Sequence, residues 1–307
     1  MREPSSPRVL VVGNPGSRGG AGLERLRRIQ SELADLGAVV RVPASPEDLV
    51  GIVREAVASG IETVVAVGGD GTVNAVVNQL AHTRVRLGVV PAGTANDLAR
   101  HMGIPADVKG ACARIRAGRA RRLDLLDING RLYVTAGGLG VVTETAIGVN
   151  RIKAPGAWSR PLVRPLGSLV YVLYSLRLLL GRALPVHDVE VSIDDEPRGR
   201  FPSTAVFVHN QPTIARRVQA CPDARNDDGL LGVCLVTRSG RLRSLFTALR
   251  MTLDGSHVNS RSVRIWSGQR VDIQSPTVKT FIGDGEVLAH SGHLRIQVVP
   301  SALEIIA

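Results

Sequence analysis

The stretch Val64-Val65-Ala66-Val67-Gly68-Gly69-Asp70-Gly71-Thr72-Val73-Asn74 joins an apolar run to a glycine-rich turn. Residues 61–67 are apolar and β-branched almost throughout, which predicts a strand covered on both faces, as in a parallel sheet. From Val73 onward apolar residues recur at helical spacing, so we expect the turn to lead into a helix. The glycines permit positive φ and let a ligand approach the backbone. A strand, a glycine turn and a helix amino terminus together favour binding of an anion such as phosphate.

Asp70 is the unexpected member of this turn, because it places a carboxylate where the charge of a phosphate would lie. This arrangement is reasonable if a divalent cation lies between the acid and the phosphate. The alternative is an ordinary strand-to-helix turn in which Asp70 is the N-cap of the helix. This stretch alone leaves both interpretations open.

A second stretch of the same kind follows at residues 87–100. The short apolar run 87–90 ends in Pro91-Ala92-Gly93-Thr94-Ala95-Asn96-Asp97-Leu98-Ala99-Arg100, where a glycine permits a tight turn and a helix is expected to begin near Asn96 and Asp97. Because adjacent parallel strands end at the same sheet edge, we expect both turns at the edge where ligands bind in open α/β folds.

Together, GGDGTVN (residues 68–74) and PAGTANDLAR (residues 91–100) resemble the diacylglycerol kinase catalytic domain in its soluble bacterial lipid kinase form. The resemblance covers nearly the whole chain, and the pair of motifs is far more specific than either alone. It implies an enzyme that uses ATP and Mg²⁺ to phosphorylate a hydroxyl of a lipid, such as diacylglycerol, at the membrane surface.

The resemblance also implies which residues bind the nucleotide. Residues 14–17 resemble the family's first nucleotide loop, although Arg18 stands where glycine is usual. The nucleotide-binding residues implied in this way are Asn14, Pro15, Gly16, Ser17, Gly68, Gly69, Asp70, Gly71, Thr72, Val73, Asn74, Ala75, Gly93, Thr94 and Asn96.

Composition fits this interpretation and limits others. A length of 307 residues allows two domains, each with its own core. The net charge of +11 suggests an anionic partner, although a solvated basic surface would give the same excess. The three cysteines have no CxxC spacing, so neither a zinc module nor a disulfide framework is indicated. Residues 1–7 lack an apolar signal core, so we expect a cytoplasmic enzyme peripheral to the inner face of the membrane, with no nucleic acid partner and with a homodimer left open.

The order of elements predicts an N-terminal doubly wound α/β domain and a C-terminal antiparallel β-sandwich. Strands alternate with helical stripes up to residue 100, which is typical of a doubly wound sheet. After the hairpin turn Asn129-Gly130 the expected strands are short and alternating. The resemblance implies that the end of the chain returns to the first domain. We therefore expect an α/β domain at 1–129 completed by 292–307, and a lipid-substrate domain at 130–291. The strands expected in the second domain are 189–193, 204–209, 230–236, 263–266, 271–273 and 278–282.

The stretch 162–184 is strongly apolar, but its longest apolar run is 166–176 and ends at Arg177. That run is too short to span a bilayer. We expect a buried or amphipathic helix and favour ordinary core packing over a stripe that faces acyl chains or a membrane.

Phosphoryl transfer to an alcohol needs alignment, charge neutralisation and a group that accepts the hydroxyl proton. The run Phe281-Ile282-Gly283-Asp284-Gly285-Glu286 resembles the family's carboxyl-terminal motif, whose glutamate is assigned as the proton acceptor. That role falls on Glu286, with Asp284 as its near neighbour. The alternative is an Asp-Gly hairpin turn with an exposed glutamate.

With this assignment, Asp70 is expected to face the Mg²⁺ of the nucleotide, while Asp97 and Asp124 complete an acidic lining between the domains. Gathered carboxylates repel one another unless cations lie among them, so the arrangement itself predicts Mg²⁺. Residues 221–230 also resemble the family's structural magnesium loop, whose ligands map to the Asp228 side chain and the backbone carbonyls of Arg225 and Leu230. The alternative there is an Asp-Asp-Gly turn between strands.

Two other functions stay open. NAD kinase has a related fold and also carries a GGDGT turn, but PAGTANDLAR and the Asp-Gly-Glu motif favour the lipid kinase pattern. A non-catalytic nucleotide- or membrane-binding protein is the third hypothesis. The presence of Asp70, Asp97 and Glu286 argues against it.

Overall fold

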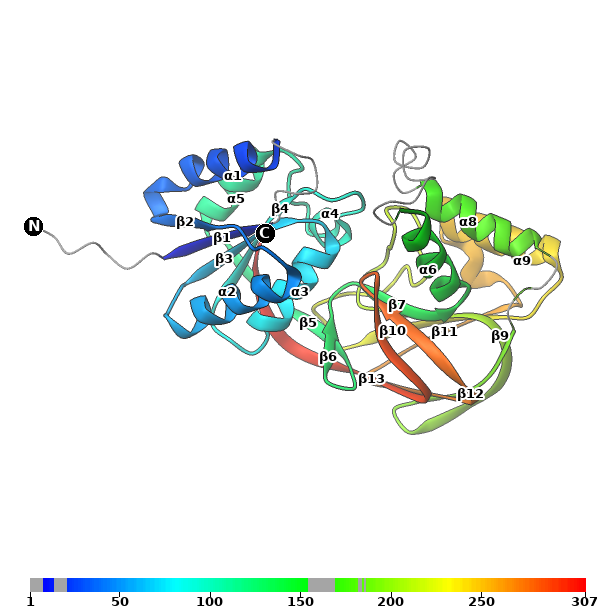
Figure 1. Ribbon diagram of the computed structural model, residues 1–307. Coiled ribbons are helices and arrows are strands. Elements are labelled where there is room, and N and C mark those ends of the chain that lie inside the picture. The colour runs from blue at the N-terminus through cyan, green and yellow to red at the C-terminus, as the bar shows by residue number, and fades with distance from the viewer. Residues whose placement is uncertain (1–7, 14–20, 154–168, 182–183, 185) are drawn as a thin grey trace, which may run out of the picture. The chain divides into compact units, whose positions relative to one another are not determined.

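The structure is a computed structural model that describes residues 8–13, 21–153, 169–181, 184 and 186–307 (Figure 1). The chain divides into two compact units, one formed by Met1–Leu125 with Pro300–Ala307 and the other by Leu126–Val299. The sequence predicted domain bounds at 129/130 and 291/292. These bounds stay a prediction, because compact units and domains are defined differently.

The first unit contains a parallel sheet covered by helices on both faces, as predicted for a doubly wound domain. Its strands lie in the order β4-β3-β1-β2, and every neighbouring pair is parallel. Helices α1 and α5 pack together on one face, and α2 and α3 pack together on the other (Figure 1). The elements are β1 (Val9–Gly13), α1 (Ala21–Glu32), the 3-10 helix η2 (Ala34–Leu36), β2 (Ala38–Arg41), α2 (Pro46–Ala58), β3 (Thr63–Gly68), α3 (Asp70–Leu80), β4 (Arg86–Pro91), α4 (Asp97–His101) and α5 (Val108–Ala117).

Local sequence signals explain where these elements begin and end. β3 is buried at every position except its last, which matches the continuous apolar run. The helical segment α1–η2 ends at Gly37, whose φ of 66° is the left-handed conformation that glycine adopts most readily. Helix α2 begins after Ser45, whose hydroxyl accepts the amide of Asp48 at 3.2 Å.

Two long strands pass between the units. β5 (Ala120–Ile128) leaves the first unit, and β13 (Glu286–Ile306) returns to it. At the end of β13, Ile305 pairs in parallel with Leu87 of β4. Asp124 is buried in β5, and its carboxylate accepts the amide of Ser301 at 2.7 Å. This bond holds Ser301 in its left-handed conformation, with a φ of 52°.

The second unit is an antiparallel β-sandwich, as predicted. Its long strands β9 and β12 both pair with β8 near their starts and with β7 near their ends. β10 pairs with β9 and β11, and β13 pairs with β12. Its elements are β6 (Arg131–Tyr133), β7 (Ala136–Gly140), α6 (Val141–Lys153), α8 (Leu169–Leu180), β8 (His187–Ile193), β9 (Glu196–His209), β10 (Leu231–Thr237), α9 (Arg241–Leu253), the 3-10 helix η3 (Ser256–Asn259), β11 (Val263–Gly268) and β12 (Arg270–Gly283).

The second unit has two hydrophobic clusters, on opposite faces of β9 and β10. Successive side chains of a strand point to opposite faces, so Val206 lies in one cluster and Phe207 lies in the other. Met251 of α9 belongs to the second cluster. Helix α9 therefore covers the sheet face that carries Phe207.

Several expectations about the second unit were wrong in detail. Residues 271–273 and 278–282 belong to one strand, β12, whose register shifts between Gln274 and Lys279. Pro276 lies in this gap, where the missing backbone amide breaks no ladder bond. β9 begins at Glu196 rather than at residue 204, because its polar first half pairs with β8 at the surface. Strand β7 and helices α6 and α9 were not expected.

Helix α8 occupies part of the apolar stretch 162–184, of which residues 162–168, 182 and 183 lie outside the described part. The helix buries Val170 and Leu179 but exposes Leu169, Leu173 and Leu180. Ordinary core packing is therefore the wrong description for this helix, which is the amphipathic member of the expected pair, a buried or an amphipathic helix. In the part of the chain that the structure describes, no helix combines the length and apolar composition that crossing a bilayer requires.

Candidate active site

Two glycine-containing turns lie side by side at the carboxyl edge of the parallel sheet in the first unit. β3 ends at Gly68 and β4 ends at Pro91, and these two residues are paired across the strands. The amide of Ala92 donates to the carbonyl oxygen of Gly68 at 2.7 Å. The structure therefore brings the two sequence motifs together at one edge.

The two turns touch each other through their backbones. A Cβ atom on Gly93 would lie 2.4 Å from the Cα of Gly69, and one on Gly68 would lie 2.5 Å from the Cβ of Thr72. Neither Gly68 nor Gly93 has a positive φ. The turns therefore need glycine here for space rather than for an unusual backbone conformation.

Asp70 links the first turn to the second. Its two carboxylate oxygens accept the amides of Asn96 at 3.0 Å and Asp97 at 2.6 Å. The Asn96 side chain closes the second turn, because its oxygen accepts the amide of Gly93 at 2.9 Å and its NH₂ donates to the carbonyl of Gly93 at 3.1 Å. The N-cap of α3 is Gly69 and not Asp70, so the capping alternative is wrong.

The amino end of α3 has the geometry predicted for an anion site. The amide of Val73 donates to the carbonyl of Gly69 at 3.0 Å, so the helix starts directly after the turn. Its N-cap residue is Gly69, which makes no side-chain cap bond to this first turn. The first backbone amides and the helix dipole therefore favour an anion at this end.

The other implied nucleotide-binding residues of the first unit have different surroundings. The side chains of Val73 and Asn74 are buried in the unit, and the side-chain amide of Asn78 donates to the side-chain and backbone oxygens of Asn74. Ala75 follows them in α3, and Thr94 is exposed in the second turn. The first nucleotide loop, with Asn14, Pro15, Gly16 and Ser17, lies outside the described residues.

The acidic side chains Asp97 and Asp124, both in the first unit, have different local surroundings. Asp97 opens the short helix α4, and the Asp124 carboxylate is occupied with the amide of Ser301. Within the described ranges, no group of three or more His, Cys, Asp or Glu side chains is placed to hold a metal ion. The expected roles of Asp70 at the nucleotide Mg²⁺ and of Asp97 and Asp124 as an acidic lining between the domains, with Glu286 as the base, stay predictions.

A second Asp-Gly turn lies in the second unit, between β12 and β13. Asp284 and Gly285 have φ values of 49° and 86°, and Gly283 pairs with Glu286 across the hairpin. Positive φ at both central residues is typical of a two-residue hairpin turn. The backbone therefore forms the Asp-Gly hairpin turn that was the alternative interpretation of this motif. Glu286 is exposed beside the turn.

Asp284 has a structural role that its motif did not reveal. Its buried carboxylate accepts the amides of Val134 at 2.7 Å and Thr135 at 2.9 Å, together with the Thr135 hydroxyl. Its own amide donates to the carbonyl of Ala136 at 3.0 Å. Asp284 therefore fixes the connection between β6 and β7 against the hairpin.

The segment that follows β9 holds the same connection from another side, and sequence reasoning missed it. The amide of Asn210 donates to the carbonyl of Thr135 at 2.9 Å, and its side chain donates to the carbonyl of Val134 at 3.1 Å. The neighbouring His209 is fully buried, and its Nδ1 donates to the carbonyl of Gln211 at 3.0 Å. Burial lowers the pKa of His209 to about 4.

Strand β7 is the other part of this region that the sequence reasoning missed. A Cβ on Gly137 would lie 2.4 Å from the ring of Phe281, and one on Gly138 would lie 2.4 Å from the carbonyl oxygen of Val206. Three glycines within the residues 136–140 were the available signal, because glycine inside a strand often marks close approach of another backbone.

The loop predicted to bind a structural magnesium ion has the geometry of a turn. One carboxylate oxygen of Asp228 accepts the amide of Leu230 at 3.0 Å, and Gly229 has a φ of 74°. The side chain of Arg225 lies 3.3 Å from the carboxylate of Asp227. Metal binding by Arg225, Asp228 and Leu230 stays a prediction.

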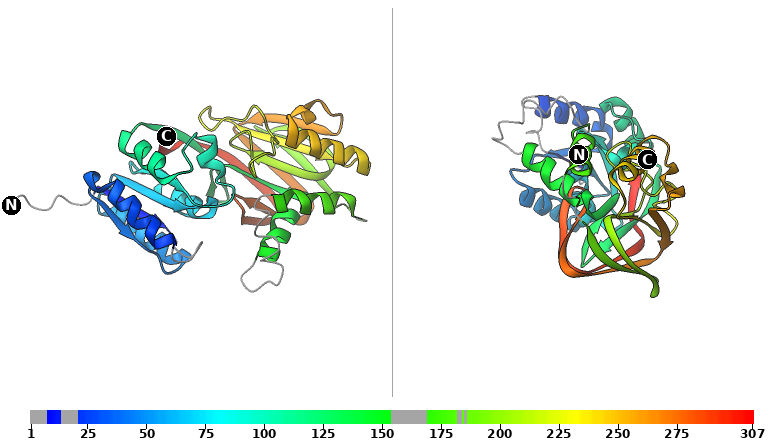
Figure 2. Two further views of the ribbon diagram at one scale, coloured as in Figure 1. Left: turned by 90° about the horizontal axis from the view of Figure 1, so that it is seen from above. Right: turned by 90° about the vertical axis from the view of Figure 1, so that its right-hand side faces the viewer.

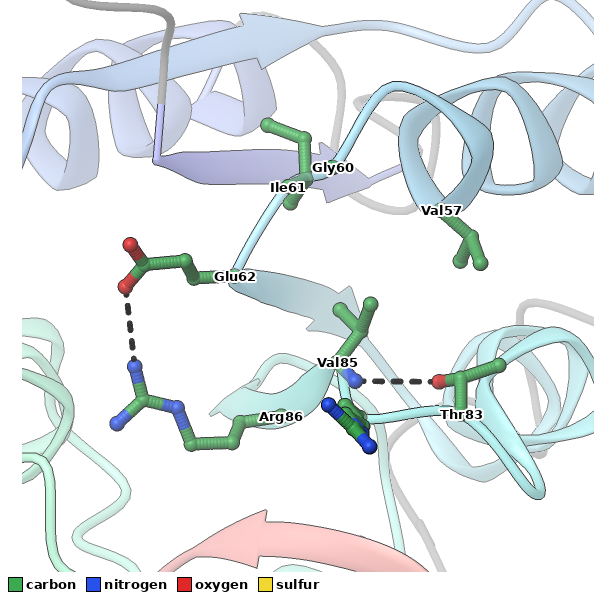
Figure 3. A pocket seen from close by; sticks show the side chains of 8 residues that line it. Val57, Gly60, Ile61, Glu62, Thr83, Val85 and Arg86 are labelled. Atoms are coloured by element: carbon green, nitrogen blue, oxygen red, sulfur yellow. Dashed lines mark hydrogen bonds and ion pairs between the residues drawn. The ribbon is translucent and has the colours of Figure 1, made fainter.

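A surface pocket of about 450 Å³ lies elsewhere in the first unit. Figure 3 shows it beside Glu62 and Arg86, which form an ion pair at 3.4 Å. These residues lie where β3 and β4 begin, and ligands of open α/β sheets bind at the opposite, carboxyl ends. We therefore do not assign this pocket to the active site.

Two family models match the chain. The diacylglycerol kinase catalytic domain matches residues 8–128, and the YegS C-terminal NAD kinase beta sandwich-like domain matches residues 157–307. A relative from Enterobacter sp. (strain 638), named "Probable lipid kinase YegS-like", is 31% identical over 310 residues, which cover 97% of this chain and 95% of the relative. The chain belongs to the diacylglycerol kinase family of lipid kinases.

Other members of the diacylglycerol kinase family show the same relationship. The "Diacylglycerol kinase" of Bacillus subtilis (strain 168) is 27% identical over 286 residues, which cover 91% of this chain and 89% of the relative. The crystal structure of a diacylglycerol kinase from Bacillus anthracis str. Sterne has a TM-score of 0.79 at 22% identity, and the match covers 99% of this chain and 98% of that one. The family and the fold class predicted from the two motifs are confirmed.

Proposed function

We propose that this lipid kinase family member transfers the γ-phosphoryl group of ATP to a hydroxyl of a membrane lipid, with diacylglycerol as the first acceptor to test. The observation that carries the proposal is the pair of glycine turns that Asp70 fixes at the sheet edge beside the amino end of α3. This edge offers phosphate groups the backbone amides at the start of α3, whose N-cap residue Gly69 makes no side-chain cap bond.

The residues of the first unit fit a nucleotide that carries Mg²⁺. The backbone of Gly68 to Thr72 would hold the phosphates, with Gly93, Thr94 and Asn96 beside them. Asp70 is half-buried beside these turns, and carboxylate oxygens are ligands that suit Mg²⁺, so Asp70 is the side chain proposed to meet the cation. When bound, Mg²⁺ neutralises charge on the phosphate oxygens.

Glu286 is the better proton acceptor of the two acids in the second turn. Asp284 is buried and uses its carboxylate for two backbone amides and one hydroxyl, whereas Glu286 is exposed. In the proposed step the lipid hydroxyl gives its proton to Glu286, and its oxygen bonds to the γ-phosphorus. The bond from that phosphorus to the β–γ bridging oxygen breaks, which leaves ADP.

The experiment incubates the protein with γ-labelled ATP, Mg²⁺ and either diacylglycerol vesicles or NAD. Label in an organic-phase product supports the proposal, and mass spectrometry of that product identifies the lipid. Label in NADP would instead favour an NAD kinase, which is the second hypothesis. The reason to test it is that the second matching domain is described as NAD kinase beta sandwich-like. No transfer to either acceptor, or to a total lipid extract, would leave a non-catalytic binding protein. A location at the inner face of the membrane belongs to the same proposal, and a homodimer stays a prediction.

A further inference from the structure

Helix α9 in the second unit directs its apolar side chains outward. Four large apolar residues on it are between 48% and 74% exposed: Leu242, Phe246, Leu249 and Leu253. At about 100° per residue, these four lie within an arc of about 60° on the helix. They therefore form one continuous stripe, which we call the α9 stripe.

The opposite side of α9 packs on the unit with a more polar set of residues. The buried residues of the helix are Ser244, Thr247 and Met251. The Ser244 and Ser239 hydroxyls lie 2.9 Å apart, and the Thr247 hydroxyl donates to the carbonyl of Arg243 at 2.9 Å. This arrangement reverses the usual one, in which the apolar face of a surface helix packs on the core.

Helix α8, which packs against α9, repeats the same spacing. Both helices lie toward the same end of the second unit in the view from above (Figure 2). Residues at the same intervals of four, three and four are all leucine: Leu169, Leu173, Leu176 and Leu180. Leu176 is half-buried, whereas Leu169, Leu173 and Leu180 are 50%, 46% and 54% exposed. Helix α8 therefore adds exposed leucines to the same pair of packed helices.

The charges on both helices point to an anionic partner. Neither helix contains an Asp or a Glu, and their charged residues are all arginines: Arg177, Arg241, Arg243 and Arg250. On α9 the arginines lie about 70–110° from the centre of the stripe, Arg241 on one side and Arg243 and Arg250 on the other. Apolar residues flanked by arginines are typical of helices that lie in the interface of an anionic bilayer.

The same charges argue against a second copy of this chain as the occupant. Two copies of this face would bring their arginines together, and the whole chain has a net charge of +11. We propose that the α9 stripe, with the exposed leucines of α8, docks the protein onto an anionic phospholipid bilayer. The inference rests on the proposed function, because docking would bring the enzyme to a lipid acceptor in the bilayer. Vesicle binding can nevertheless be measured without any phosphoryl transfer.

The first test changes the stripe itself. The double variant Phe246→Ser/Leu249→Ser should bind vesicles that contain phosphatidylglycerol roughly tenfold or more weakly than the parent protein, in a flotation assay. The matched control is Val278→Ser on β12, a side chain that is 56% exposed and lies on neither helix, and it should bind like the parent. Thermal unfolding of all three proteins should agree, because the changed side chains are exposed.

The second test changes the flanking charge. Arg243→Gln/Arg250→Gln should weaken binding to phosphatidylglycerol vesicles by roughly twenty-five-fold, at about fivefold for each arginine near an anionic surface. Its binding to pure phosphatidylcholine vesicles should not change. Raising the salt concentration should weaken the parent in the same direction. Arg27→Gln/Arg28→Gln on α1 removes the same charge from the first unit and should have little effect.

Parent-like vesicle binding by Phe246→Ser/Leu249→Ser, or no vesicle binding by the parent, would overturn the inference. A parental dimer that this variant dissociates, with vesicle binding unchanged, would identify a second copy as the occupant and also overturn it. Vesicle binding that needs the stripe, in a protein that phosphorylates no lipid, would support docking while the proposed function fails. Phosphorylation of a dispersed short-chain lipid by a protein that does not bind vesicles would support the proposed function and overturn the docking inference.

Discussion

The turn at Asp70 in the first unit and the turn at Asp284 in the second both place an Asp-Gly pair within two residues of the end of a strand. In each, the carboxylate accepts two backbone amides from a separate segment, Asn96 and Asp97 for Asp70 and Val134 and Thr135 for Asp284. The first turn leads into a helix and the second into a hairpin.

The two aspartates differ in burial. Asp284 is 9% exposed and accepts a further hydroxyl, whereas Asp70 is only half-buried. A half-buried carboxylate can support a backbone and still meet a ligand, but a buried one with three donors has little capacity left. The same dipeptide therefore leaves its carboxylate half-buried in one unit and buries it in the other.

The largest expected effect is a loss of turnover on replacing Glu286, which tests this residue separately from the Asp284 turn beside it. Glu286→Gln should lower the turnover number by roughly 10²–10⁴-fold, because the amide has the same shape but cannot accept the hydroxyl proton. ATP affinity measured by calorimetry should stay close to that of the parent. Glu190→Gln, an exposed glutamate on β8, is the control and should be fully active. Equal losses of turnover and ATP affinity would remove Glu286 as the base.

A smaller effect is expected from the contact between the two glycine turns. Gly93→Ala places a Cβ 2.4 Å from the Cα of Gly69, so the turns must separate. Overpacking of this kind costs about 1–3 kcal/mol, which would weaken ATP binding roughly 5- to 150-fold. Gly51→Ala in α2 adds the same methyl group with nothing within 4 Å and should leave calorimetric ATP affinity unchanged. If Gly93→Ala binds ATP like the parent, the turn is not part of the nucleotide site.

The two aspartates themselves should respond differently to the same substitution. Asp284→Asn turns an NH₂ toward buried amide donors and should lower the free energy of unfolding by about 2–4 kcal/mol. Asp70→Asn should cost about 1 kcal/mol, because its surroundings are partly solvated, and should act mainly on Mg²⁺-dependent ATP binding. Urea unfolding of both variants gives the comparison. A larger loss of stability for Asp70→Asn would mean that exposure does not separate the two roles.

The smallest expected effect is the pH dependence of stability that comes from His209 in the second unit. Burial lowers the pKa of His209 from 6.5 to about 4 in the folded protein. Between these values the unfolded chain binds a proton that the folded chain does not, so stability should fall as the pH drops from 6.5 toward 4, by up to about 3 kcal/mol. His209→Gln should flatten this dependence in thermal unfolding between pH 4 and pH 7. An unchanged slope in that variant would assign the dependence to other groups.

Strong local signals made much of the fold predictable. The buried run of β3, the left-handed stop at Gly37 and the N-cap at Ser45 each act over a few residues, so they can be read without knowing what packs against them. Strand β7 and helix α9 were missed because their signals depend on neighbours. The glycines of β7 make sense only beside the Phe281 ring, and α9 packs by its polar side.

The same distinction applies to the candidate site. Two motifs separated along the chain were expected to meet because parallel strands end at a common edge, and Gly68 and Pro91 do pair there. The partners of Asp70, Asp124 and Asp284 could not be predicted. A carboxylate accepts any amide that the fold brings to it, and Ser301 is far from Asp124 in the sequence.

The sequence by itself determined the family, the α/β and β-sandwich classes and the two glycine-containing turns, because each depends on local backbone preferences and on motifs of fixed spacing. The tertiary structure alone decided which acids support the backbone and which stay accessible, and it alone showed that α9 exposes its apolar side. Both outcomes depend on what lies next to a residue in space, which the order of residues along the chain does not state.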